Sequence, residues 1–180
     1  RYCQTQKSRK YERVTMFHLT AEEREALEAA SSYEEAAMVA IDHLRRLCIE
    51  YGPLVQICGP ISTGGLGSRE RNLKRLSKYV DACYMRGFAI FNQLHFEGIV
   101  KRFSPEHGPQ SYDPRILPNF YEPVLRQGFI TRLYFLPDWD TSEGAKYERR
   151  LGERFKIEIQ EYPEEWHKSA RIQARLQARR

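Results

Sequence analysis

A glycine-rich segment follows the first strongly apolar run of the chain and could bind a small ligand. The run Leu54–Cys58 leads directly into Gly59, and Gly64, Gly65 and Gly67 follow shortly afterwards. Three glycines within four positions let backbone N–H groups converge at the start of the next helix. The positive end of that helix dipole attracts phosphate or carboxylate groups.

Polar side chains in the same segment strengthen this interpretation. Ser62, Thr63 and Ser68 provide hydroxyl groups, and Arg69 and Arg71 provide positive charge. The segment is not a P-loop, because no Gly-Lys-Ser/Thr follows, and it does not match the dinucleotide fingerprint. We expect an anion-binding loop, and the alternative is a tight strand-to-helix turn that binds nothing.

A second segment combines a carboxylate with a close-approach glycine at the start of a later helix. Ser142, Gly144 and Glu148 follow an apolar run, and Glu148 lies four residues beyond Gly144, about one helical turn. A carboxylate there could act as a nucleophile or a base. A solvated ion pair with a neighbouring Lys or Arg is the alternative, and Glu143 is a rival for the chemical role.

Five further residues are weaker candidates for contacts with a ligand. Asn92 and Gln93 carry amide groups suited to a nucleobase or a sugar, and His95 and Glu97 follow them closely. Trp139 could stack on a base, although packing beneath the loop is the more common role for such a residue.

The pattern of apolar residues predicts the elements that must position these groups. Helices are expected over about 20–30, 32–50, 68–85, 119–127 and 140–151, and strands over 54–58, 88–91, 132–136 and 155–159. Strand, glycine-rich turn, helix and strand form a βαβ unit, which implies a parallel sheet. The residues between 92 and 117 have no clear period and are expected to form a long functional loop.

The predicted fold class is therefore α/β, with a flavodoxin/Rossmann-like doubly wound parallel sheet of four to five strands. Residues 1–52 are expected to form an N-terminal helical extension packed on the core. Residues 53–180 are expected to form the α/β domain, ending in a basic helix.

Composition excludes several classes of protein. The 180 residues are 41% hydrophobic and 29% charged, as in ordinary globular domains, and no run approaches the roughly 18 apolar residues of a membrane span. The four cysteines (Cys3, Cys48, Cys58 and Cys83) have no metal-ligand spacing and are expected to be free thiols. We therefore expect a cytoplasmic protein without a metal site.

The net charge of +5 is concentrated at the two ends of the chain. Residues 1–13 and 168–180 are basic, which suits either a polyanion partner or solvated ends that aid solubility. No nucleic-acid-binding motif accompanies them. Nucleic acid is therefore not the expected partner.

The motifs together resemble those of the nucleoside 2-deoxyribosyltransferase-like family, closest to the 2′-deoxynucleoside 5′-phosphate N-hydrolase branch. The resemblance covers roughly residues 54–159 and is carried by Cys58-Gly59-x-Ile61, Gly64-Gly65, Phe91-Asn92-Gln93 and Ser142-x-Gly144-x-x-Tyr147-Glu148. It implies that Glu148 is the nucleophile that attacks the sugar C1′. It also implies that the loop glycines with Ser62 and Arg69 hold a 5′-phosphate, and that Ser142 helps to bind phosphate or sugar.

In two respects the chain departs from this family. The hydrolase branch has an arginine before its glycine pair, where this chain has Ser62 and Thr63. The family also uses an aspartate before the third strand to assist the leaving base. Asp113 lies far from that strand in sequence, and Glu122 is nearer the expected place.

The expected function is hydrolysis or transfer of an N-glycosidic bond in a nucleoside or nucleoside 5′-monophosphate. No cofactor is expected, and the resemblance implies a homodimer or a larger homo-oligomer. Two alternatives remain open: a non-catalytic nucleotide sensor, and an interaction domain that binds a polyanion or protein through its basic tail.

Overall fold

The computed structural model describes residues 18–103 and 113–166, without the side chains of residues 100 and 101. The two basic segments, 1–13 and 168–180, lie outside the described residues, as do Cys3 and His107. The predictions made for these parts of the chain therefore have no structural counterpart.

The two predicted N-terminal helices are confirmed, together with the residues that begin and end them. Helix α2 (Ala21–Ala29) opens with a reciprocal capping box between Thr20 and Glu23. Helix α3 (Tyr33–Tyr51) is capped by the Ser32 side chain. It ends at Gly52, whose φ of 84° favours glycine.

The predicted βαβ unit is present, except that its second strand is reduced to a single bridge. Strand β1 (Leu54–Cys58) is fully buried and leads through the glycine-rich loop into helix α4 (Arg69–Met85). Of the predicted strand 88–91, only Ile90 pairs with β1, in parallel to Val55. The pairing stops there because Asn92 caps a new helical turn by accepting a hydrogen bond from the Leu94 N–H.

The segment predicted as a long loop contains helical structure. A 3₁₀ turn, η1 (Gln93–Phe96), runs into helix α5 (Glu97–Phe103). After residue 112 the chain forms a π-helical turn, η3 (Leu117–Tyr121), and helix α6 (Glu122–Arg126). The last two elements correspond to the helix predicted over 119–127.

The strand, helix and strand predicted over 132–159 are present with different limits. Strand β2 (Ile130–Phe135) is followed by a 3₁₀ turn, η4 (Trp139–Thr141), helix α7 (Glu143–Phe155) and strand β3 (Glu158–Glu161). Helix α7 extends to Phe155, the first residue of the predicted strand. It ends where Lys156 adopts a left-handed conformation with φ of 57°.

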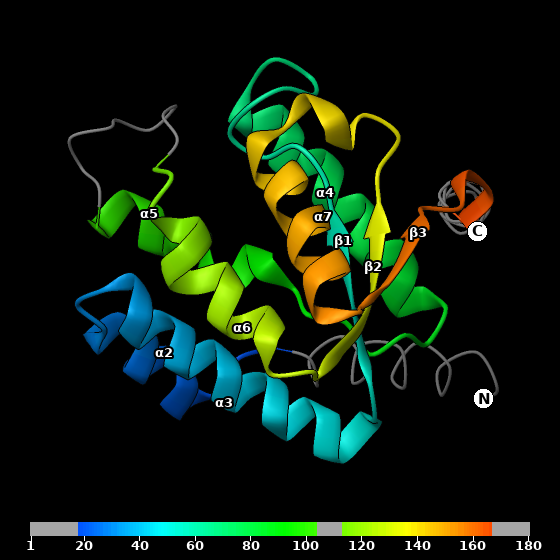
Figure 1. Ribbon diagram of the computed structural model, residues 1–180. Helices are drawn as coiled ribbons and strands as arrows, with labels where there is room; N and C mark the ends of the chain where they lie inside the picture. Colours follow the sequence, from blue (N-terminus) through cyan, green and yellow to red (C-terminus); the bar gives the residue numbers. More distant parts are fainter. Residues whose placement is uncertain (1–17, 104–112, 167–180) are drawn as a thin grey trace, which may run out of the picture.

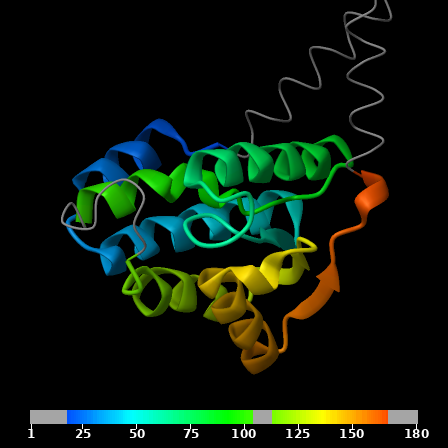
Figure 2. The same ribbon diagram turned by 90° about the horizontal axis from the view of Figure 1, so that it is seen from above.

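The described residues form an α/β fold with a three-stranded parallel sheet in the order β1-β2-β3, rather than a sheet of four to five strands. Helices α4 and α7 lie on opposite faces of this sheet (Figures 1 and 2). This arrangement is consistent with a Rossmann-like class. Gly152 allows α7 to approach the sheet, because a Cβ there would lie 2.9 Å from the Leu133 side chain.

One hydrophobic core joins the N-terminal helices to the sheet layer. It includes Leu44 and Leu47 of α3, Leu54 of β1 and Leu125 of α6, all fully buried. Within the described ranges, no helix has the length and apolar character needed to cross a membrane.

Candidate functional site

A pocket opens at the carboxyl end of β1, between the glycine-rich loop and the start of α7. Figure 1 shows these two segments at the same end of the sheet. The pocket encloses about 530 Å³ of empty space, part of it open to solvent. Segments far apart in the sequence meet there, as parallel-sheet topology dictates. The residues that line it are Gly59, Ile61, Ser62, Thr63, Glu97, Asp113, Ile116, Leu117, Tyr121, Ser142, Gly144, Ala145 and Glu148.

Glu148 lies on the inner face of α7, where only neutral groups hydrogen-bond to its carboxyl group. Gln56 is paired in register with Leu133, so Gln56 and Cys58 point to the sheet face that α7 covers. The Gln56 amide donates to Glu148 Oε1 over 2.6 Å, and the Cys58 thiol is a second hydrogen-bond partner. Burial raises the pKa of Glu148 to about 8, although both hydrogen bonds lower it.

Asp113 is the second buried carboxylate of the pocket, and its surroundings are charged. The Tyr33 hydroxyl of α3 donates to Oδ2 over 2.9 Å. Arg115 contacts Asp113 through its backbone N–H, its Nε and its Nη2, the last at 2.9 Å. The guanidinium favours the ionised form of its partner, so Asp113 and Glu148 differ in the charge that surrounds them.

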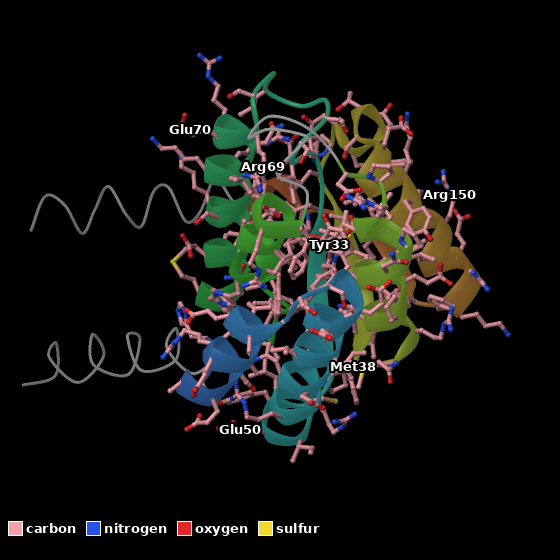
Figure 3. All side chains as sticks on the ribbon, turned by 90° about the vertical axis from the view of Figure 1, so that its left-hand side faces the viewer. Tyr33, Met38, Glu50, Arg69, Glu70 and Arg150 are labelled. Carbon is pink, nitrogen blue, oxygen red and sulfur yellow. The ribbon has the colours of Figure 1, made fainter. Side chains whose placement is uncertain are left out.

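Glu97 and Tyr121 complete the polar wall of the pocket. Glu97 forms an ion pair with Arg69, which is nearly buried at the start of α4. In Figure 3, Arg69 lies toward the middle of the molecule, whereas its neighbour Glu70 lies at the edge. Burial raises the pKa of the Tyr121 hydroxyl well above its usual range, and the charges of Glu97 and Glu148 raise it further.

The glycine-rich loop is held in place by Asn72 of α4, a buried side chain with three hydrogen bonds. Asn72 Oδ1 accepts from the Leu66 N–H over 2.8 Å. Its amide group donates to the backbone carbonyls of Ile61 and Gly64, each over 3.1 Å. These bonds satisfy buried polar groups of an irregular segment that has no ladder partners.

The loop is also joined directly to the entry of α7. Thr63 Oγ1 accepts from the Glu143 N–H over 3.2 Å, and Thr141 Oγ1 accepts from the Gly65 N–H over 2.9 Å. At Gly64, with φ of 68°, a Cβ would lie 2.2 Å from the carbonyl oxygen of Thr141. The close contact and the positive φ both require glycine at this position.

Most residues chosen from the two sequence motifs line this single pocket. Gly59, Ile61, Ser62 and Thr63 come from the loop, and Ser142, Gly144 and Glu148 come from the start of α7. Ser142 caps α7, since its Oγ accepts from the Ala145 N–H over 3.3 Å. Gly64, Gly65 and Arg69 are not among the lining residues.

The two carboxylates considered for assisting the leaving base lie in different places. Asp113 lines the pocket, although it is distant from β2 in sequence. Glu122 is not among the lining residues. It accepts a hydrogen bond from the Tyr147 hydroxyl over 2.8 Å and pairs with Arg126 and Arg154 on the outside of α6 and α7.

The remaining predicted binding residues have structural contacts and do not line the pocket. Asn92 caps η1 and forms a hydrogen bond with Tyr84. Gln93 is buried in η1. Trp139 packs edge-on against Phe135, with their ring centroids 5.4 Å apart.

Sequence reasoning missed the residues that orient the two carboxylates and the loop. Asn72 sits within an amphipathic helix and Tyr33 lies eighty positions from Asp113, so neither forms part of a local motif. Gln56 could have been found from the sequence, because a polar side chain inside a fully buried strand needs a hydrogen-bond partner.

Within the described part of the chain, no group of three or more His, Cys, Asp and Glu side chains could hold a metal ion. The pocket chemistry that can be assigned is that of carboxyl, hydroxyl and amide groups. Comparisons of the chain with protein-family models, with curated proteins and with solved structures found no match.

Proposed function

We propose that the pocket hydrolyses or transfers the N-glycosidic bond of a nucleoside or nucleoside 5′-monophosphate, with Glu148 as the nucleophile. The observation that carries this proposal is the meeting of two buried carboxylates, Glu148 and Asp113, at the walls of one pocket. Paired carboxylates in unlike surroundings are the usual means of cleaving glycosidic bonds.

In the first step, a Glu148 carboxylate oxygen bonds to C1′ while the C1′–N bond breaks and its electron pair stays with the base. In the second step, water attacks C1′, which restores the carboxylate and supplies the proton that the released base requires. A second base in place of water gives transfer. Positive charge builds on the sugar in both steps, and the anionic Asp113 stabilises it.

The environment of Glu148 suits a nucleophile that must be reactive. Few hydrogen bonds and no cation stabilise its carboxylate, so little solvation is lost when the carboxylate attacks. Ser62, Thr63 and Ser142 line the same pocket and offer hydroxyl groups to the sugar. Ile116 and Leu117 provide an apolar wall for a base.

The test is a panel of ribo- and deoxynucleosides and their 5′-monophosphates, with free base followed by chromatography. Glu148→Gln is expected to abolish base release from every substrate that the wild-type chain cleaves. Glu143→Gln is the matched control, because Glu143 lies on the same helix but pairs at the surface with Lys146 over 2.9 Å. It should retain wild-type activity. No base release from any member of the panel would overturn the proposal.

A further inference from the structure

The described wall of the pocket carries acidic side chains and no basic one. Glu97, Asp113 and Glu148 all line it, and among the described lining residues there is no Lys or Arg. An incoming dianion would therefore meet acidic groups without a lysine or arginine on the described wall to contact it.

The two arginines nearest these acids are already paired. Arg69 contacts the Glu97 carboxylate and lies 3.4 Å from the Glu97 carbonyl oxygen. The Arg115 guanidinium contacts both oxygens of Asp113, at 3.0 and 2.9 Å. A phosphate would therefore compete with an existing carboxylate partner for either arginine.

Four backbone donors of the loop and of the start of α7 are also engaged within the protein. The Gly65 N–H donates to Thr141 and the Leu66 N–H donates to Asn72. At the start of α7, the Glu143 and Ala145 N–H groups donate to the hydroxyls of Thr63 and Ser142. These four oriented amides, of the kind that attract phosphate at such loops, are thus satisfied without a ligand.

The remaining polar groups of the pocket match a neutral sugar. Carboxylates accept hydrogen bonds from hydroxyl groups, and the hydroxyl hydrogens of Ser62 and Ser142 can be donated in return. We infer that the substrate is an unphosphorylated nucleoside and that the site discriminates against the corresponding 5′-monophosphate. This inference rests on the proposed function and narrows its substrate class.

The first test compares each nucleoside with its own 5′-monophosphate by calorimetric binding to the full chain carrying Glu148→Gln, which cannot turn the ligand over. The nucleoside should bind at least tenfold more tightly, and the difference should shrink at high salt, which screens repulsion. Equal or tighter binding of the monophosphate overturns the inference, as does the absence of binding by both ligands.

The second test removes the negative charge of Glu97, the ion-pair partner of Arg69. Glu97→Gln should bring the two affinities closer together, because it removes one negative charge and releases the guanidinium. Glu158→Gln is the matched control, since Glu158 pairs with Arg132 at the surface of the sheet over 2.7 Å and does not line the pocket. An unchanged nucleoside preference in Glu97→Gln overturns the inference. If that variant does not fold, the salt series on the first variant decides.

The two proposals fail in different ways. Nucleoside-selective binding without base release by the wild-type chain would contradict the proposed function while supporting this inference. Base release that is faster from 5′-monophosphates would support the proposed function and overturn this inference.

Discussion

Glu143 and Glu148 lie on one helix only five positions apart, yet their carboxyl groups have opposite surroundings. Glu143 is exposed, and the Lys146 ammonium holds its pKa below the usual range. Glu148 is buried among neutral partners, and burial raises its pKa to about 8. The two side chains lie on different faces of α7, because five positions are not a whole number of helical turns. One face is exposed and the other is buried, which accounts for the difference.

The raised pKa of Glu148 predicts how base release depends on pH. A nucleophilic carboxylate must be ionised, so kcat/KM should rise with pH and level off above about pH 8. The measurement is kcat/KM for nucleoside cleavage between pH 5 and 9.5. A rate that instead falls as pH rises through 8 would mean that Glu148 acts as a proton donor, contrary to the role proposed for it.

Tyr33→Phe tests whether the hydrogen bond from the Tyr33 hydroxyl of α3 to Asp113 contributes to the site. The change removes one hydroxyl that donates to Asp113 and leaves the Arg115 ion pair in place. We expect a loss of about 1 kcal/mol in unfolding free energy and a several-fold fall in kcat. Tyr147→Phe is the control, since it removes a similar bond to Glu122 outside the pocket. Equal activity of the two variants would show that Tyr33 does not act on the site.

At the scale of elements, the glycine-rich loop and α7 form one joined unit held by Asn72. Asn72→Ala leaves the Leu66 N–H and two carbonyls without their partner, and it should reduce the unfolding free energy by about 2 kcal/mol. Gln127→Ala, which removes one exposed bond to the Pro123 carbonyl, should cost less than about 0.5 kcal/mol. Denaturant unfolding of both variants measures the difference. Equal effects would contradict the support assigned to Asn72.

The sequence predicted the elements that have strong local signals. Helices α2 and α3 were foreseen because Thr20 and Ser32 are good caps and Gly52 ends a helix readily. The strand over 88–91 was not realised, since pairing along β1 depends on where Asn92 turns the chain. The start of β3 shifted because α7 continues to Phe155 and Lys156 then adopts a left-handed conformation, so the strand begins only at Glu158.

In the candidate site too, the parts with local sequence signals were predicted and the parts set by distant contacts were not. The loop and the Ser142–Glu148 segment were identified because each is a local motif at the carboxyl end of a strand. The partners Gln56, Tyr33 and Asn72 depend on contacts between distant segments, which no spacing in the sequence records. Functional sites commonly combine local motifs with such distant support.

At the scale of the whole molecule, the buried Glu148 makes stability depend on pH. Its folded-state pKa of about 8 lies above the ordinary value of 4.5, so the folded protein holds a proton that the unfolded chain releases. Stability from this group is fully present below pH 4.5 and is lost as pH rises to about 8.

Glu148→Gln removes this dependence. Between pH 4.5 and pH 8.5, the variant should gain stability relative to wild type by on the order of 4 kcal/mol. Unfolding in denaturant at the two pH values gives the comparison. A constant difference between the two proteins would contradict the buried, protonated state of Glu148.

The most direct test of Glu148 as the nucleophile is mass spectrometry of the protein after mixing with a 2′-fluorinated nucleoside. Fluorine at C2′ disfavours positive charge on the sugar and slows hydrolysis of a glycosyl ester. We predict that the intact protein gains the mass of one sugar and that peptide analysis places the sugar on Glu148. Base release without an adduct, or an adduct on another residue, would contradict the assignment.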